Sequence, residues 1–358
     1  MKTILNLMVL LATVVAAQAQ NAQVAKIRQM YAEAMKQIQN NGRGGQAPLD
    51  LTVSISDATE VDDDFTIYDE TQLTFYFNKY RVNAELDYPD ASSCYFVTED
   101  WSANGHTRYR EMLFDTNEGN LLFSYVRQET HAGYVMESRY YFDADGKLVE
   151  QKHKEGGKDV VRDDDEWNSA DSERQLATCY LEIFDDVMNP GSLHLSSDER
   201  MAAANPERMK LIRSTYAQAK AKIADSEKEM LAREMSVVVR DQTWGPPSTT
   251  EQNFYFDYTV RDGNPEPYCY FIAEHRHHNN MGPDLYSEYL FAPVSPDLMF
   301  AYTSAKEEGE HHEWRYYYDE RGQCFEAKTD ADEHDSGNES RAQAYRLLKT
   351  FRKLTTLN

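Results

Sequence analysis

Hydrophobic residues recur at helical spacing, every three or four positions, in four stretches of the chain. These stretches are residues 27–38, 174–188, 212–223 and 341–354. In the first of them, Ile27, Tyr31, Ala34 and Ile38 fall on one face of a helix. Such a stripe is typical of a helix that packs on a sheet or a core.

Runs rich in Phe, Tyr and Val between these helices predict β-strands. In the first half of the chain the runs include residues 51–55, 71–77, 94–98, 108–114, 121–127 and 134–142. Short polar or glycine-bearing breaks separate many of them, which favours an antiparallel meander over parallel crossovers. Large aromatic residues occur at both odd and even positions along these strands, and alternate positions face opposite sides of the sheet. We therefore expect both faces of the sheet to be covered.

The pattern of the first half returns in the second half in the same order. Residues 137–152 and 313–328 share eight of 16 positions without a gap. Shorter matching blocks are 27–34 with 212–219, 75–77 with 254–256, 94–97 with 269–272, 109–114 with 286–291, and 122–125 with 299–302. The sequence therefore predicts an α+β protein of two tandem repeats, each with an N-terminal helix, an antiparallel β-meander sheet and a C-terminal helix.

The ends of these repeats predict the domain organisation. We expect a signal peptide over residues 1–19, a first domain over 20–189, a linker over 190–206 and a second domain over 207–358. The signal peptide is indicated by Lys2, an apolar run and small residues at Ala17 and Ala19. Cleavage near Ala19 would make the protein secreted or periplasmic, and an uncut helix that serves as an anchor is the competing interpretation.

Composition narrows the partners. With 61 acidic against 37 basic residues the formal charge is −24, which repels phosphate backbones, so we expect no nucleic acid partner. No later segment reaches the roughly 20 apolar residues of a membrane helix, and an integral membrane protein is not expected. The 24 tyrosines allow large aromatic cores, and the oligomeric state is left open.

Aromatic residues on the predicted strands are candidates for binding a ligand such as a glycan, or a protein. These candidates are Trp101, Tyr109, Tyr125, Tyr286, Tyr302 and Trp314. Packing in the core or between domains is the alternative. Carboxylate and guanidinium pairs on the same strands, such as Glu137 with Arg139 near Glu111, indicate either a polar ligand site or a charge network that fixes register.

Histidines gather in the second repeat at the ends of two predicted strands. They are His275, His277, His278, His311 and His312. Imidazole is a common metal ligand, so a divalent metal such as zinc is a possible cofactor, although no other cofactor is predicted. The two strands are third neighbours, about 14 Å apart at roughly 4.8 Å per strand, and solvated loop histidines are the alternative.

The remaining chemistry concerns cysteines and a turn. Export permits disulfides, and the simplest pairing joins Cys94 to Cys179 and Cys269 to Cys324. The alternative is that Cys94 and Cys269 are small buried residues at strand starts. The segment that ends at Gly146 resembles a calcium loop only superficially, and we expect a hairpin turn there.

The sequence lacks the nucleophile elbow, the phosphate-binding glycine loop and the dinucleotide fingerprint. We therefore expect an exported noncatalytic protein that binds a ligand or partner, or acts structurally, through its aromatic sheet faces or the cleft between domains. The alternative is a hydrolase or metal-dependent enzyme whose site uses the histidines of the second repeat.

Overall fold

The computed structural model describes residues 2–41, 49–62, 65–80, 91–116, 119–161, 169–189, 205–229, 233–241, 248–261, 263–278, 283–307, 310–329 and 337–355. Contacts divide the chain into two compact units. The first unit comprises Met1–Pro48 and Leu73–Leu181, and the second comprises Leu49–Gln72 and Glu182–Asn358. Most of the predicted linker, residues 190–204, lies outside the described residues.

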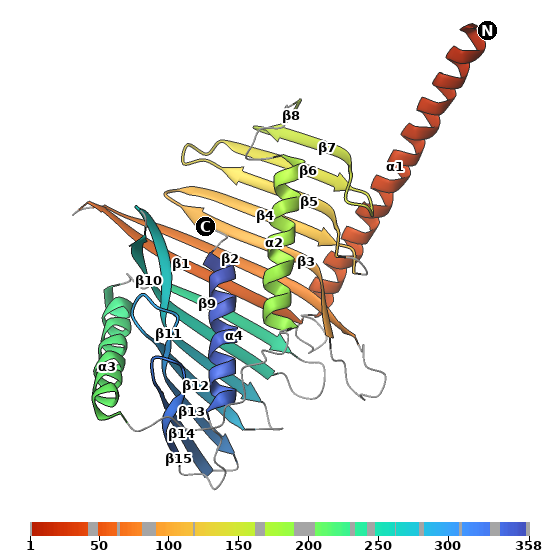
Figure 1. Cartoon of the computed structure of the whole chain (residues 1–358). Helices are drawn as coiled ribbons and strands as arrows, with labels where there is room; N and C mark the ends of the chain where they lie inside the picture. The colour runs from red at the N-terminus through yellow and green to blue at the C-terminus, as the bar shows by residue number, and fades with distance from the viewer. Residues whose placement is uncertain are drawn as a thin grey trace. The chain divides into compact units, whose positions relative to one another are not determined.

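The first unit contains a run of antiparallel strands with a helix before and after it (Figure 1). Its elements are α1 (Lys2–Asn41), the second part of β2 (Phe65–Tyr80), β3 (Ala91–Ala103), β4 (His106–Phe114), β5 (Leu121–Glu129), β6 (Val135–Phe142), β7 (Leu148–Glu155), β8 (Lys158–Val160) and most of α2 (Ala170–Met188). The strands follow one another in chain order from β2 to β8. The predicted antiparallel sheet is confirmed.

The second unit has its own series of antiparallel strands. Its elements are β1 (Asp50–Asp62), α3 (Pro206–Glu229), β9 (Glu234–Asp241), β10 (Ser248–Arg261), β11 (Asn264–His278), β12 (Asp284–Phe291), β13 (Leu298–Glu307), β14 (Glu310–Tyr318), β15 (Cys324–Thr329) and α4 (Asn338–Leu354). The order is β15-β14-β13-β12-β11-β10-β9-β1. β1 therefore pairs with β9, with Leu51 opposite Val239, although residues 51–55 lie early in the chain.

Neighbouring residues of β4 show which helix covers which face of the first unit's sheet. Glu111 accepts a hydrogen bond from the hydroxyl of Tyr31 in α1 at 2.6 Å. Its neighbour Arg110 donates to Glu173 in α2 at 3.1 Å. Because consecutive side chains of a strand point to opposite faces, α1 and α2 cover opposite faces of this sheet.

The second unit has the same two-sided arrangement. Glu288 of β12 accepts a hydrogen bond from Tyr216 of α3. Ala273 of β11 stands opposite Glu288 and packs against the hydrophobic cluster beneath α3. The next residue, Glu274, turns to the other face and accepts a hydrogen bond from Gln343 of α4 at 3.1 Å. α4 crosses the strands of this unit on that second face (Figure 1).

Apolar side chains between α1 and the sheet form the core of the first unit. Its buried members are Val24, Ile27, Ala34, Tyr95, Phe96, Leu113, Leu122, Phe123 and Tyr141. The corresponding cluster of the second unit joins α3 to β10–β14 and includes Ile212, Ala219, Ile223, Phe271, Leu290, Phe300 and Tyr317. Burying one such side chain contributes about 1.5–3 kcal/mol to stability. The apolar stripe of each helix therefore holds that helix to its sheet.

Charged groups are buried on the opposite face of the first unit. Arg110 is 5% exposed, and Glu99 and Glu173 are each 1% exposed. Arg110 bonds both carboxylates, while Tyr180 of α2 donates to Glu99 at 2.7 Å and Ser124 donates to Glu173 at 2.6 Å. Every member of the network thus has partners, as buried charges require.

The second unit fills this face differently. Phe254 stacks on Phe351 of α4 with ring centroids 6.3 Å apart. The buried Glu274 is held by Gln252 at 2.9 Å and by Arg276 at 2.9 Å. Aromatic rings pack against both helices, as Phe75 does on Tyr180 of α2, but the face against α4 buries fewer charged side chains than the face against α2.

The turn at Asp143 is held by its own side chain. The carboxylate of Asp143 accepts hydrogen bonds from the backbone N–H groups of Asp145 and Lys147, at 3.1 and 2.8 Å. Gly146 has φ 75°, a value that glycine adopts without steric cost. Asp319 and Gly322 repeat this arrangement between β14 and β15. Both carboxylates therefore serve the turn.

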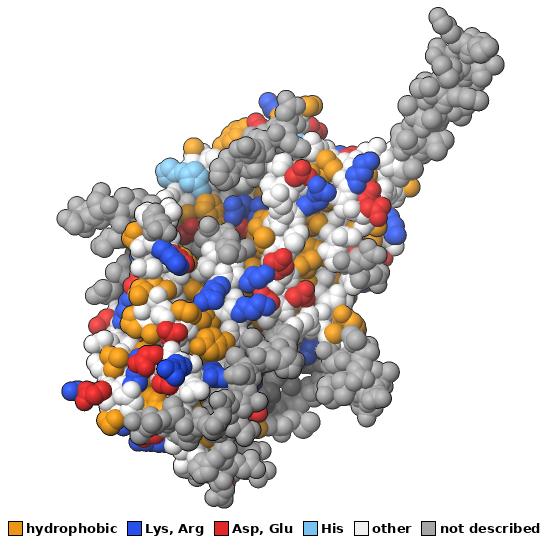
Figure 2. Space-filling model, viewed as in Figure 1, with side chains coloured by type: hydrophobic (Ala, Val, Ile, Leu, Met, Phe, Trp, Pro, Cys, Tyr) orange, Lys and Arg blue, Asp and Glu red, His pale blue; other side chains and the backbone are white. Residues whose placement is uncertain are grey.

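No described helix combines the length and the apolar character needed to cross a membrane. On the face shown in Figure 2, acidic and basic side chains lie interspersed, with hydrophobic side chains between them. Nearby opposite charges on such a surface contribute little to stability individually.

Arg110→Met is expected to destabilise the protein by about 3–5 kcal/mol, because it leaves two buried carboxylates without their shared cation. Urea unfolding followed by circular dichroism measures this. The triple variant Glu99→Gln/Arg110→Met/Glu173→Gln removes all three charges and should recover much of the loss. The control Arg127→Met breaks a pair with 39% exposed side chains and should cost less than about 0.5 kcal/mol. Equal losses for Arg110→Met and Arg127→Met would contradict this account.

Glu99 should also make stability depend on acid pH. Burial alone would raise its pKa, but Arg110, Arg108 and the Tyr180 hydroxyl outweigh burial and hold the pKa of Glu99 below its ordinary range. A lowered folded pKa stabilises the protein above the unfolded value of about 4.3, and this stabilisation is lost as the pH falls through the folded pKa. The urea concentration at the unfolding midpoint should therefore decrease as the pH is lowered below about 4. Glu99→Gln should make this decrease with pH less steep. An unchanged slope in the variant would refute the assignment.

Candidate functional site

A buried carboxylate forms the floor of a pocket between α1 and the sheet of the first unit. Glu111 is 8% exposed. The hydroxyl of Tyr31 donates to its Oε2 at 2.6 Å, and that of Tyr109 donates to its Oε1 at 2.8 Å. The Tyr31 ring packs edge-on against Phe123 at 5.2 Å, so the apolar core fixes the ring whose hydroxyl holds the floor.

Two arginines stand above this floor, and each lies over a tyrosine ring. The guanidinium of Arg139 is 5.0 Å from the ring centroid of Tyr125, and that of Arg28 is 5.4 Å from Tyr141. A guanidinium stacked on an aromatic ring is held in a fixed plane. The side chains of Arg28 and Arg139 are 55% and 31% exposed, so both can meet a ligand that enters from solvent.

These groups line one cavity of about 400 Å³. Its lining residues are Ile27, Arg28, Tyr31, Glu111, Phe123, Tyr125, Arg139 and Tyr141. Pockets of about 300–1,000 Å³, mostly apolar with a few convergent polar groups, are typical of small-molecule sites.

The second unit contains a cavity of about 460 Å³ between α3 and its sheet. Its lining residues are Ile212, Arg213, Tyr216, Glu288, Phe300, Tyr302, Arg315 and Tyr317. Each has the residue type found at the corresponding place in the first pocket. Glu288 is again the floor, with Tyr216 and Tyr286 as hydroxyl donors, and Arg315 lies 5.4 Å from the ring of Tyr302.

The tyrosines of both floors act as hydrogen-bond donors. Burial, followed by the hydrogen bond to Glu111, raises the pKa of Tyr31 and of Tyr109 well above the ordinary value. The same causes, with Glu288 as the partner, raise the pKa of Tyr216 and of Tyr286. All four phenols therefore stay protonated at neutral pH and act as hydrogen-bond donors.

Four of the six aromatic candidates from the sequence lie at these pockets. Tyr125 and Tyr302 line them, and Tyr109 and Tyr286 hold the floor carboxylates. Trp101 and Trp314 belong to neither lining. Trp101 lies beneath the guanidinium of Arg108 at 5.0 Å, and Trp314 lies 6.1 Å from the ring of His312.

The sequence alone did not single out Arg28, Tyr31, Arg213 and Tyr216 as site residues. They belong to the matching blocks 27–34 and 212–219, where the two tyrosines were assigned to an apolar helical stripe. The sequence did contain a signal for these residues, because Arg28 and Arg213 match between the two blocks whereas the next residues, Gln29 and Ser214, differ.

The histidines lie at the end of β11 and at the start of β14, with β12 and β13 between these two strands. His277 pairs with Asp284 at 2.7 Å, and the strand register continues from Asp284 to Lys306 and then to His311. A lysine therefore stands between the two groups of histidines. His275 lies 6.3 Å from Tyr286, and the side chain of His278 lies outside the described residues.

Within the part of the chain that the structure describes, no group of three or more His, Cys, Asp or Glu side chains is arranged to hold a metal ion. A zinc site at these histidines stays a prediction.

No disulfide joins the four cysteines, all of which lie within the described ranges. Cys94, Cys269 and Cys324 are buried, whereas Cys179 is exposed. The thiols of Cys94 and Cys269 each donate to the backbone carbonyl two residues further on, at 3.6 and 3.4 Å. Burial raises the pKa of the Cys269 thiol, which makes it a poor nucleophile. The predicted pairings stay predictions.

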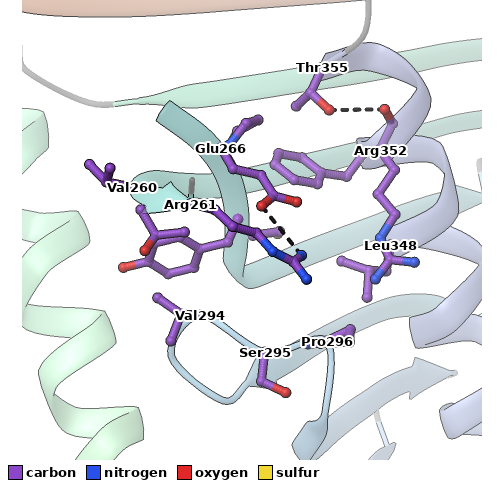
Figure 3. Close-up of a pocket in the computed structure, with 14 residues that line it drawn as sticks. Val260, Arg261, Glu266, Val294, Ser295, Pro296, Leu348, Arg352 and Thr355 are labelled. Atoms are coloured by element: carbon purple, nitrogen blue, oxygen red, sulfur yellow. Dashed lines mark hydrogen bonds and ion pairs between the residues drawn. The ribbon is translucent and has the colours of Figure 1, made fainter. Parts of the chain in front are cut away.

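The second unit also has a wider hollow of about 710 Å³, shown in Figure 3. The labelled side chains come from the β10–β11 hairpin, the β12–β13 turn and the end of α4. Arg261 and Glu266 pair with each other at 3.6 Å, with side chains 75% and 52% exposed. Because its one ion pair is exposed and its lining includes no buried charged side chain, this hollow offers less for specific recognition than the two pockets.

Tyr31→Phe is expected to destabilise the protein by about 1–2 kcal/mol, because the buried Glu111 loses a charge-assisted hydrogen bond. Tyr216→Phe is the matched variant and should cost less, since Lys220 also holds Glu288 at 3.0 Å. Urea unfolding of both proteins gives the comparison. A larger loss for Tyr216→Phe would contradict this account of the floors.

Comparison of the chain with protein families, with characterised proteins and with solved structures found no match. The choice of the two pockets as the candidate site therefore depends on their residues and geometry.

Proposed function

We propose that the protein is an exported, noncatalytic binding protein that holds a small organic anion in each of two equivalent pockets. We further infer that the two pockets belong to diverged tandem copies of one α+β module, each with an N-terminal helix, a meander sheet and a C-terminal helix. The observation that carries the proposal is the agreement of all eight lining residues between the pockets.

Packing alone accounts for part of this agreement. Ile27, Phe123 and Tyr141 are buried core residues, and a core retains its apolar residues for stability. It does not account for Arg28 and Arg139, whose side chains are 55% and 31% exposed. Two exposed arginines in the same places of both pockets favour a ligand.

Anion binding follows from the state of these arginines. Each guanidinium carries five N–H donors in a plane that matches a carboxylate or a phosphate. Arg139 contacts Glu137 at 3.3 Å and Arg28 contacts Glu150 at 3.8 Å, both at the solvent-exposed surface. Such pairs contribute little, so an entering anion can replace them.

Binding is favoured over hydrolysis by the number of carboxylates. Each lining contains a single one, Glu111 or Glu288, and both accept hydrogen bonds from tyrosines. Most glycoside hydrolases use a pair of carboxylates on either side of the bond they break. The lining offers one acceptor and two cations instead, which suits recognition of a charged ligand.

Two binding events per chain are expected. Isothermal titration of the purified protein against a panel of aliphatic and aromatic carboxylates, acidic sugars and phosphorylated sugars should find a ligand with a stoichiometry of two. Tyr125→Ala and Tyr302→Ala each remove the ring beneath an arginine, so each variant should bind once and the double variant should not bind.

Tyr134→Ala is the control, because Tyr134 is 46% exposed and lies outside both linings. It should leave two binding events. Binding that survives in the double variant would refute the pockets as the site, and a well-folded protein that binds nothing in the panel would refute anion binding.

A further inference from the structure

The two pockets share their lining but differ in one charged residue beside the floor. Lys220 of α3, one helical turn after Tyr216, places its ammonium 3.0 Å from Glu288. The residue one turn after Tyr31 in α1 is Met35, which packs against the hydrophobic core. The second floor therefore has a cation of the protein's own, and the first has a thioether at that place.

The two floor carboxylates differ in what they still accept. An ionised carboxylate has about four acceptor positions. Glu111 receives hydrogen bonds from Tyr31 and Tyr109, both neutral donors. Glu288 receives two tyrosine hydroxyls and the Lys220 ammonium. The floor of the first pocket thus receives hydrogen bonds from two neutral hydroxyls, whereas the floor of the second also receives one from a protein ammonium.

We propose that the first pocket binds a zwitterion and the second binds a plain carboxylate. In the first, the ligand carboxylate meets Arg28 and Arg139 and the ligand ammonium meets Glu111. In the second, Lys220 takes the place of that ammonium on Glu288. This selectivity rests on the proposed function of anion binding.

The charges of the two sites match these ligands. Once a ligand carboxylate replaces Glu150 and Glu137 at Arg28 and Arg139, a ligand ammonium can pair with Glu111, so a ligand with both signs can contact the arginines and the carboxylate together. Lys220 adds a further positive charge to the second pocket and repels a ligand ammonium, because like charges a few ångströms apart oppose each other strongly in a partly buried site. Because Glu288 is already paired with Lys220, it offers a ligand cation less electrostatic compensation for the cost of desolvation.

Matched pairs of probes that differ only in an ammonium group test the proposal. The probes are phenylalanine with 3-phenylpropanoate and 5-aminopentanoate with pentanoate, which sample two separations between the charges. Tyr302→Ala isolates the first pocket and Tyr125→Ala isolates the second. By titration calorimetry or NMR, the first pocket should bind an amine-bearing probe at least about tenfold more tightly than its partner, and the second should show the reverse preference.

Exchanging the one differing residue should exchange the preference. Lys220→Met should make the second pocket favour the amine-bearing probe, and Met35→Lys should make the first favour the plain carboxylate. Because Met35 packs in the core, Glu111→Gln is the second test, and it should abolish the first pocket's preference for the amine-bearing probe. Lys222→Met is the control on α3, since Lys222 pairs with Asp257, and it should change neither preference.

The outcomes separate this inference from the proposed function. Carboxylate binding at both pockets without a preference, or a preference that Lys220→Met and Glu111→Gln leave unchanged, would overturn the inference and leave anion binding intact. Failure of both pockets to bind any carboxylate, in the panel or among these probes, would overturn both.

Discussion

A glutamate buried beneath a helix must be given donors, since an isolated carboxylate is costly to remove from water. Four glutamates meet this requirement, and they are Glu99, Glu111, Glu274 and Glu288, each at most 8% exposed. In each case one donor comes from a helix: α2 for Glu99, α1 for Glu111, α4 for Glu274 and α3 for Glu288. Apolar packing holds the helices to the sheets, but it is not directional. These directional hydrogen bonds therefore fix the position of each helix along the strands.

The same requirement explains why the two faces of each unit have different roles. Glu99, Arg110 and Glu173 on one face are enclosed by protein, so these charges stabilise the fold and are not accessible to a ligand. Glu111 lies under a pocket that opens between two exposed arginines. On the enclosed face the two units also differ more: where the first has Arg110 and Ser124, the second has Ser287 and Ala301.

Much of the fold was accessible from the sequence because it depends on local pattern. The helical stripe containing Ile27 and Ile38, the aromatic strand runs and the antiparallel order all follow from periodicity and turn residues. The partners of Glu111 did not follow. The sequence predicts that its carboxylate belongs either to a polar ligand site or to a charge network with Arg139. Its hydrogen-bond donors are instead the hydroxyls of Tyr31 and Tyr109, and Tyr31 lies in a helix 80 residues away in the chain.

Contacts of this kind depend on how a helix lies on a sheet, which periodicity does not determine. Tyr31 shows this limit. Its ring packs in the apolar core as the helical stripe predicts, while its hydroxyl donates to Glu111, which the stripe does not predict. The histidines show a second limit. Strand order places His277 and His311 on third-neighbour strands, but it does not tell which residues stand between them. The register places Asp284 and Lys306 there, and register is set by side-chain fit along the whole ladder.

The pairing of β1 with β9 has a consequence for biosynthesis. Leu51 and Val239 stand opposite each other, so β1 leaves the ribosome long before its partner strand is made. The second unit cannot complete this ladder until residues 234–241 have emerged, whereas the strands of the first unit meet neighbours that follow within a few dozen residues. Contacts between distant parts of a chain form slowly. The first unit should therefore assemble early. Until β9 has been synthesised, the edge of β1 that pairs with β9 stays open to other proteins near the ribosome.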